Sequence, residues 1–210
     1  MSLLRTHLLA PLGQAATYRR LAYVASALVL GPAWFVLLVT GWSLGVGLAI
    51  TLIGIPILIG LAMAAAVCAR AERAMVNGLL DASIPPRHAP GWDRSITGAL
   101  RAWVGDAAAW REQLYLLLRF AAGLPAAVIV VSVIGAALSG ITAPAYYAFG
   151  DGIELGFARA DTLPEALALV PAGALVLLLC PPLIDVAAAA SRAVAWGLLG
   201  PGPGREAAPR

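Results

Sequence analysis

The pattern of apolar and polar positions divides the chain into long apolar segments separated by shorter polar ones. No charged residue occurs between Arg20 and Arg70. A membrane-spanning helix needs about 20 mostly apolar residues to cross a hydrocarbon core of ~30 Å. This stretch is long enough for two such helices, 21–40 and 44–67. The residues between them, Gly41-Trp42-Ser43, favour a turn, and Trp42 suits an outer interface. The pattern therefore predicts a transmembrane helical hairpin.

A polar linker follows the first hairpin. The helix 44–67 is expected to continue into the cytosol and to end near Gly78 or Asp81. Its polar side carries Arg70, Glu72 and Arg73. Prolines in 84–91 favour extended structure. The segment 92–104 has apolar residues at helical spacing, which predicts an amphipathic helix. It lies either on the inner membrane face or on the protein's own cytosolic ends.

The second half predicts another, more elaborate hairpin. Asp106 is a good N-cap for a helix that starts near Ala107 and spans 113–138. Thr162 and Glu165 have the spacing of a capping box, so the last helix begins there and continues to Gly200. Between these helices, the outer loop 141–161 carries aromatic and acidic side chains. They form either a surface for an apolar or cationic ligand or an aromatic cap on the bundle. The residues in question are Tyr146, Tyr147, Phe149, Asp151, Glu154 and Phe157.

The predicted fold is all-α: a polytopic membrane protein with four transmembrane helices in two repeated hairpins, joined by an amphipathic cytosolic linker helix. The repeat rests on matching anchors. Arg19, Tyr23 and Gly31 recur as Arg111, Tyr115 and Gly123, and RAMVNGLL recurs as RAVAWGLL. Both halves start inside, which is the parallel type of repeat. The predicted segments are a cytosolic N-terminal segment 1–20, hairpin 21–68, linker 69–112, hairpin 113–200 and an unstructured tail 201–210.

Composition agrees with a membrane protein, and charge predicts its orientation. Hydrophobic residues make up 61% of the chain and charged residues 12%, against about 25% charged in soluble domains. The basic residues are all arginine. Outside the predicted spans, only Arg159 is expected on the outer side. The positive-inside rule therefore places both termini and the linker in the cytoplasm, with the protein in the plasma membrane as a multi-pass protein.

Two charged residues are predicted inside the second hairpin. Rise along a helix puts Arg119 and Asp185 at similar depth. Because buried ionisable groups in a membrane are costly and normally paired, we predict an ion pair between them. It is either a structural clamp or a proton-responsive switch. Prolines that interrupt the predicted helices are candidate hinges. They are Pro32, Pro56, Pro125, Pro181 and Pro182.

Catalytic chemistry has little support in the sequence. His7 and His88 lie in polar flanking segments, and no His, Cys or Asp cluster has metal-ligand spacing. Cys68 and Cys180 are expected to be free, packed thiols. The chain has no lysine and no Walker-type phosphate loop. We therefore expect no enzyme activity, no cofactor, no metal and no nucleic acid.

Several runs resemble a known family. They are WFVLLVTGWSLGVGLAITLIGIPIL, the RAER that leaves the second helix, the IPP of the linker, and DAAAWREQLYLLLRF. Between Tyr18 and Leu199, the chain resembles the "putative sensor" domain of actinobacterial membrane proteins. That domain commonly precedes a histidine-kinase module of a two-component system, and other members stand alone. No kinase module follows here, so the resemblance implies a stand-alone member.

Three kinds of function follow. The leading expectation is a stand-alone membrane sensor or accessory module that detects an envelope or lipid-borne cue. It would pass a helix shift through 70–80 and 192–199 to a histidine kinase or other signalling protein in trans. Its other expected partners are the lipid bilayer and a second copy in a homodimer. The alternative is a small transporter or permease-like subunit, which the proline-broken helices favour, or a ligand-free scaffold.

Overall fold

The computed structural model describes residues 14–87, 96–147, 153–154, 159–160 and 162–201. Within them, four helices are long and apolar enough to cross a membrane. They are Ala15–Gly47, Gly54–Leu80, Ala107–Ala145 and Leu163–Leu199. The prediction of an all-α membrane protein with four spanning helices is confirmed.

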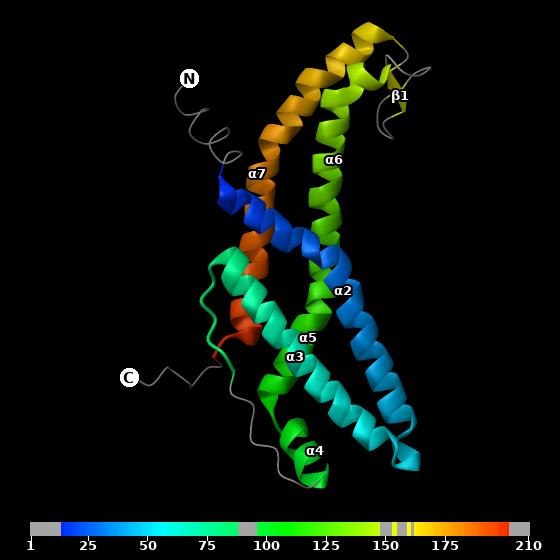
Figure 1. The fold of residues 1–210 in the computed structure, drawn as a ribbon, viewed down its shortest axis with the longest axis vertical. Coiled ribbons are helices and arrows are strands. Elements are labelled where there is room, and N and C mark those ends of the chain that lie inside the picture. The colour runs from blue at the N-terminus through cyan, green and yellow to red at the C-terminus, as the bar shows by residue number, and fades with distance from the viewer. Residues whose placement is uncertain (1–13, 88–95, 148–152, 155–158, 161, 202–210) are drawn as a thin grey trace. The chain divides into compact units, whose positions relative to one another are not determined.

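The helices are labelled in Figure 1. Helix α2 covers Ala15–Gly47, the short 3-10 helix η3 covers Ala49–Thr51, and α3 covers Gly54–Leu80. After the linker come α4 (Ile96–Val104) and α5 (Ala107–Leu118). The π-helical segment η4 (Arg119–Gly123) joins α5 to α6 (Leu124–Tyr147) without a break. The last helix, α7, covers Leu163–Leu199.

The first turn lies later than predicted. Gly41, Trp42 and Ser43 belong to α2, and the chain reverses between Leu48 and Ile53 instead. Leu52 takes a left-handed conformation with φ of 63°, and the amide of Gly54 donates to the carbonyl of Leu48 at 3.0 Å. A Cβ at Gly54 would lie 2.1 Å from the carbonyl oxygen of Gly45. Only glycine permits this approach, which locates the turn.

The helix starts predicted from capping residues are confirmed. Asp106 precedes α5, and its carboxylate accepts a hydrogen bond of 3.0 Å from the amide of Ala108. At the start of α7, the amide of Thr162 donates to the carboxylate of Glu165 at 3.2 Å, as in a capping box. Helix α3 ends at Leu80, and Asp81 follows in the left-handed region with φ of 51°. Residues 139–144 do not end the third spanning helix as predicted, because α6 continues through Pro144 to Tyr147.

The outer loop is therefore shorter than predicted. Residues 141–147 belong to α6, and two short antiparallel strands follow, β1 (Ile153–Glu154) and β2 (Arg159–Ala160). Ile153 pairs with Ala160. Phe149, Asp151 and Phe157 lie outside the described residues, and so do the side chains of Tyr146, Tyr147 and Glu154.

The chain divides into two compact units. The first contains residues 1–25 and 126–187, and the second contains 26–125 and 188–210. Each unit combines parts of both predicted hairpins. In the first unit, α6 and α7 approach closely through glycines. A Cβ at Gly173 would lie 2.6 Å from the carbonyl oxygen of Ala137, and a Cβ at Gly140 would lie 3.3 Å from the Cα of Gly173. Small residues let two helix backbones meet in this way.

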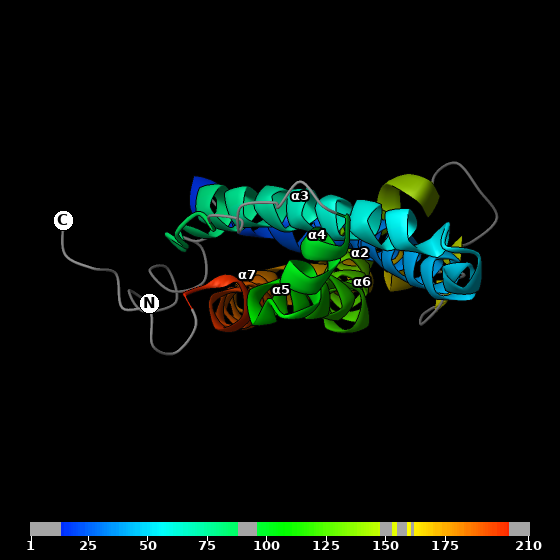
Figure 2. The same ribbon diagram turned by 90° about the horizontal axis from the view of Figure 1, so that it is seen from below.

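In the second unit, α2 packs on α3 through two glycines of α2. A Cβ at Gly41 would lie 2.5 Å from a methyl group of Leu61, and one at Gly45 would lie 2.4 Å from a methyl group of Leu58. Helix α3 also packs against α4 and α5, which lie beside it in Figure 2. This unit brings together most of the charged side chains described below.

Three tryptophans join α2, α4 and α5. The ring of Trp42 lies 5.6 Å from that of Trp103 and 5.5 Å from that of Trp110, and Trp103 is buried. Of the two positions left open for the amphipathic segment, the described part of α4 packs on the protein itself.

Candidate functional site

Buried charged and polar side chains are concentrated where α3 crosses α5. They are Glu72 and Arg73 on α3, Glu112 and Gln113 on α5, and Arg119 in η4, all at most 5% exposed. Ionic groups removed from water are costly unless paired and hydrogen-bonded. In this apolar chain, the free-energy cost of removing charged groups from water is therefore concentrated at the crossing of α3 and α5. This concentration makes the crossing the candidate site.

Glu72 is the centre of the first half of the site. Its side chain is fully buried. Its carboxylate accepts hydrogen bonds from the indole of Trp34 at 2.9 Å and from the hydroxyl of Tyr115 at 3.2 Å. The guanidinium of Arg119 lies 3.5 Å away and forms an ion pair with it. Two hydrogen-bond donors, from α2 and α5, and one cation, from η4, thus converge on one carboxylate of α3.

Arg119 lies where the helix changes from α to π geometry. Its guanidinium also donates to the hydroxyl of Ser26 at 2.7 Å. The π-helical segment ends directly before Leu124 and Pro125. Proline has no amide hydrogen to donate to the preceding turn, and this irregularity accompanies the local widening. A π-helical turn inside an α-helix is frequent at functional sites.

Glycines let α2 approach this segment. A Cβ at Gly31 would lie 3.2 Å from the carbonyl oxygen of Arg119, and a Cβ at Gly123 would lie 3.5 Å from the Cβ of Ala27. Gly31 therefore faces Arg119, and Gly123 faces Ala27, across the crossing. The rings of Phe35 and Phe120 stack at 4.3 Å on the same interface.

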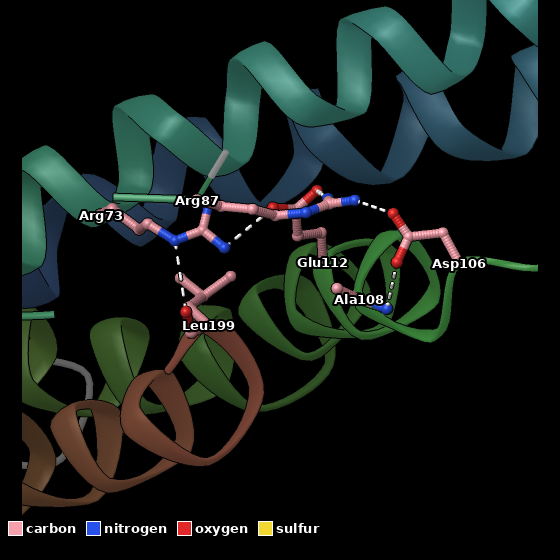
Figure 3. Close-up of polar contacts among 6 residues, drawn as sticks. All are labelled: Arg73, Arg87, Asp106, Ala108, Glu112 and Leu199. Atoms are coloured by element: carbon pink, nitrogen blue, oxygen red, sulfur yellow. Dashed lines mark hydrogen bonds and ion pairs between the residues drawn. The ribbon is translucent and has the colours of Figure 1, made fainter. Parts of the chain in front are cut away.

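Arg73 is the centre of the second half of the site. Its Nη2 donates to the Glu112 carboxylate at 2.8 Å, and its Nε donates to the carbonyl oxygen of Leu199 at 3.3 Å. Figure 3 shows the side chain reaching from α3 to both α5 and the end of α7. Trp196 on α7 adds a second link, because its indole donates to the carbonyl oxygen of Ala82 at 2.8 Å. The ends of α3 and α7 are thus held together by two hydrogen bonds.

Arg87 attaches the linker to the same network. Its guanidinium pairs with the carboxylates of Glu112 and Asp106 (Figure 3). Glu112 therefore accepts from two arginines at once. Asp106 combines this ion pair with its role as the N-cap of α5. The linker, α3, α5 and α7 meet in one charged cluster, which we call the Arg73 junction: Arg73, Arg87, Asp106, Glu112 and the carbonyl of Leu199.

The two charges predicted to pair with each other have different partners in the structure. Arg119 pairs with Glu72, whereas Asp185 pairs with Arg20 on α2 at 2.6 Å. Both Arg20 and Asp185 are nearly half exposed. The predicted ion pair between Arg119 and Asp185 was based on their similar depth in the second hairpin alone. Glu72 was assigned to a solvated helix surface, but packing against α5 buries that surface.

The sequence signal for the missed residues was the RAER run of α3. Glu72 and Arg73 were assigned to a polar side together with Arg70, but Arg70 and Ala71 are exposed, whereas Glu72 and Arg73 are buried. A glutamate and an arginine that follow a span without other charges indicate buried partners elsewhere in the chain. Their partners Tyr115 and Glu112 lie within the WREQLY run, which is too distant in sequence for spacing to connect them.

The proline positions divide into two groups. Pro56 lies in the first turn of α3, where proline is tolerated without a bend. Pro125 follows the π-helical segment, inside the continuous helix formed by α5, η4 and α6. Pro32 lies inside α2, and Pro181 and Pro182 lie inside α7. The prediction that Pro56 interrupts a helix is therefore wrong. The other predicted prolines lie inside helices, where the lost backbone hydrogen bond makes a hinge physically reasonable.

Other candidate chemistry is limited. In the described part of the chain, no group of three or more His, Cys, Asp or Glu side chains could hold a metal ion. Cys68 and Cys180 are free and buried, as predicted.

The comparison with protein families supports the resemblance found in the sequence. The model of the family described as "Putative sensor" matches residues 23–199, which is most of the chain. The chain therefore belongs to this family, and it is a membrane sensor module by family and by its four apolar helices. Comparisons with curated proteins and with solved structures found no match.

Proposed function

We propose that this protein is a sensor that converts an envelope or lipid-borne cue into a displacement of the ends of α3 and α7. A signalling partner in trans, such as a histidine kinase, reads that displacement. No catalytic step takes part. The protein acts in the plasma membrane, with both termini and the arginine-rich linker in the cytoplasm.

The observation that carries the proposal is the double attachment of Arg73. This buried side chain donates to Glu112 on α5 and to the carbonyl of Leu199 on α7. The ends of α3 and α7 are also the output segments expected from the sequence. A single buried arginine that bonds to two other helices couples any relative movement of the three.

Such a junction has the physical properties of a switch. Buried, hydrogen-bonded charges do not tolerate gradual separation, because each partial displacement leaves a group unpaired at a cost of about 1–3 kcal/mol or more. The helices therefore favour discrete arrangements over a continuum. The prolines inside α2 and α7 and the π-helical segment supply places where those helices can bend.

The test is a crosslinked pull-down of the tagged full chain from native membranes, with partners identified by mass spectrometry. Arg73→Gln breaks the junction, and Trp196→Phe removes only the hydrogen bond to Ala82. Arg101→Gln is the matched control, because it removes one exposed arginine from α4. Membrane abundance and monodispersity in detergent are measured for every variant.

We expect the wild-type chain and Arg101→Gln to recover a histidine kinase or a transcription regulator. Recovery should fall with Trp196→Phe and be lost with Arg73→Gln. Equal recovery from all four chains would contradict a readout through this junction. Recovery of an ATPase or transporter components would favour the transport alternative, for which the proline-containing helices are the supporting feature. Recovery of the chain's own copies alone would refute a partner in trans.

A further inference from the structure

Large apolar side chains are exposed at the turn between α2 and α3. We call this group the apolar tip: Val46, Leu48, Ile50, Leu52 and Ile53. Ile50 is 94% exposed and Leu52 is 71% exposed. Large exposed apolar patches mark surfaces that a membrane or another molecule covers. The tip therefore has the composition of a surface with an apolar partner.

The tip has almost no polar side chain to offer to water. Turns at aqueous surfaces favour Gly, Pro, Asn, Asp and Ser. Between Val46 and Ile53, the only polar side chain is Thr51, and its hydroxyl already donates to the carbonyl oxygen of Leu48 at 2.8 Å. The nearest charged residues in the sequence are Arg20 and Arg70. This composition suits a hydrocarbon environment better than an aqueous one.

The helix starts at the tip differ from those in polar segments. Helix α5 begins at the capping carboxylate of Asp106, and α7 begins at the capping box of Thr162 and Glu165. At the tip, η3 follows Leu48 and α3 follows Ile53, and neither residue makes a side-chain cap hydrogen bond. Capping side chains or water normally satisfy the free amides of a helix start. The tip therefore needs another source of acceptors.

Carbonyl groups of the turn itself supply acceptors. The amides of Thr51 and Gly54 both donate to the carbonyl oxygen of Leu48, at 3.1 and 3.0 Å. The amide of Leu52 donates to the carbonyl oxygen of Ala49 at 3.1 Å. Because hydrocarbon contains no water, backbone groups placed there must find their partners within the protein. These three amides of the turn meet that requirement.

We propose that the apolar tip lies in the hydrocarbon layer of the bilayer, where lipid acyl chains cover it. Exposed valines lead along α2 to the tip: Val29, Val36, Val39 and Val46. Their spacings of seven, three and seven positions are those of one helix face. The lipid that covers this face of α2 therefore reaches the tip without interruption. The inference goes beyond the proposed function, because the contact requires neither a cue nor a signalling partner.

The experiment uses single-cysteine variants of the full chain in phosphatidylcholine nanodiscs, which leave both faces of the bilayer open to reagents. The two buried cysteines are first replaced, as Cys68→Ala and Cys180→Ala. Ile50→Cys then probes the tip. Glu165→Cys is the aqueous reference, at the exposed polar start of α7, and Leu175→Cys is the hydrocarbon reference, at an exposed apolar position inside α7.

Two properties of each cysteine are measured. The first is its rate of reaction with a charged maleimide that does not enter the bilayer, in nanodiscs and in SDS. The second uses chains labelled with the fluorophore NBD in detergent and then reconstituted. Quenching of NBD by doxyl-labelled phosphatidylcholine reports contact with acyl chains, and quenching by iodide reports contact with water.

In nanodiscs we expect Ile50→Cys and Leu175→Cys to react at least about tenfold more slowly than Glu165→Cys, because the reactive thiolate hardly forms in hydrocarbon. All three should react at similar rates in SDS. NBD on Ile50→Cys should be quenched by the doxyl lipid and hardly by iodide.

Two results would overturn the proposal. Reaction of Ile50→Cys as fast as Glu165→Cys would place the tip in water. Slow reaction without quenching by the doxyl lipid would mean that protein, such as a second copy of the chain, covers the tip instead of lipid. Because no signalling partner is captured in this assay, its failure is distinct from failure of the sensor proposal.

Discussion

The ion pair between Glu72 and Arg119 predicts a specific pattern of stability in a double-mutant cycle. Glu72→Gln keeps the shape of the side chain but removes the charge that faces Arg119. The 3.5 Å ion pair is then lost, and the arginine is left 4% exposed without its counter-charge. Breaking a buried pair from one side costs about 3–5 kcal/mol, mostly because the remaining charge is uncompensated. Arg119→Met should cost a similar amount, since Glu72 would retain only the two neutral donors Trp34 and Tyr115.

The double variant should cost less than the two single variants together. With both charges removed, no uncompensated charge stays at the crossing, and a methionine fills most of the volume of the arginine. We expect a coupling energy of about 2 kcal/mol, within the range of about 0.5–3 kcal/mol found for residues in contact. Equilibrium unfolding in mixed micelles of increasing SDS content, followed by tryptophan fluorescence and near-ultraviolet circular dichroism, measures the four free energies of unfolding.

Glu165→Gln removes an exposed carboxylate at the start of α7 and should cost no more than about 1 kcal/mol, as for a helix cap. If the free energies of Glu72→Gln and Arg119→Met add within about 0.5 kcal/mol, the two groups do not interact. The structural basis of the first half of the site would then be refuted.

Three further predictions concern packing and backbone geometry. Gly173→Ala should lower the unfolding temperature, because its Cβ would lie 2.6 Å from a carbonyl oxygen of α6. Gly135→Ala is the control: no atom lies within 4 Å of its added Cβ, and the higher helix propensity of alanine, about 1 kcal/mol, should raise the unfolding temperature. Leu52→Gly should leave stability unchanged or raise it by up to about 1 kcal/mol, because Leu52 has a φ of 63°, which glycine adopts without strain. Leu48→Gly should lower stability, because Leu48 has an ordinary φ of −94°. The opposite order of the two variants in thermal unfolding would contradict the turn. Trp103→Ala should cost about 3–5 kcal/mol and reduce the near-ultraviolet circular dichroism of the stacked rings, and an unchanged spectrum would contradict the cluster.

The positions where helices begin were readable because the signals are local. A capping residue acts on amides two or three positions away, so Asp106, Thr162 and Glu165 could be interpreted without tertiary information. The first turn was placed too early because Gly41 was taken as a turn residue. In the structure Gly41, like Gly45, serves the packing of α2 on Leu58 and Leu61. A glycine in an apolar stretch is compatible with a turn or with close helix packing, and only the neighbouring element distinguishes the two.

Two charges within the apolar segments could be located in the sequence but not paired. Arg119 and Asp185 were recognisable as charges within apolar segments. Their partners Glu72 and Arg20 lie in α3 and α2, at sequence distances that spacing cannot connect. Helix spacing relates residues three or four positions apart, whereas an ion pair between helices depends on their crossing and rotation. Which charged residues pair with each other is therefore decided only when the helices pack.

The amino-acid sequence by itself determined that the chain forms apolar helices long enough to span a membrane, where several of them begin, and to which family the chain belongs. These properties depend on local composition, on capping and on motif content. The tertiary structure alone decided that Glu72 and Arg73 are buried and that α3 and α7 meet at one arginine. The physical reason is that burial and pairing are properties of surfaces brought together, and a one-dimensional pattern does not specify which surfaces those are.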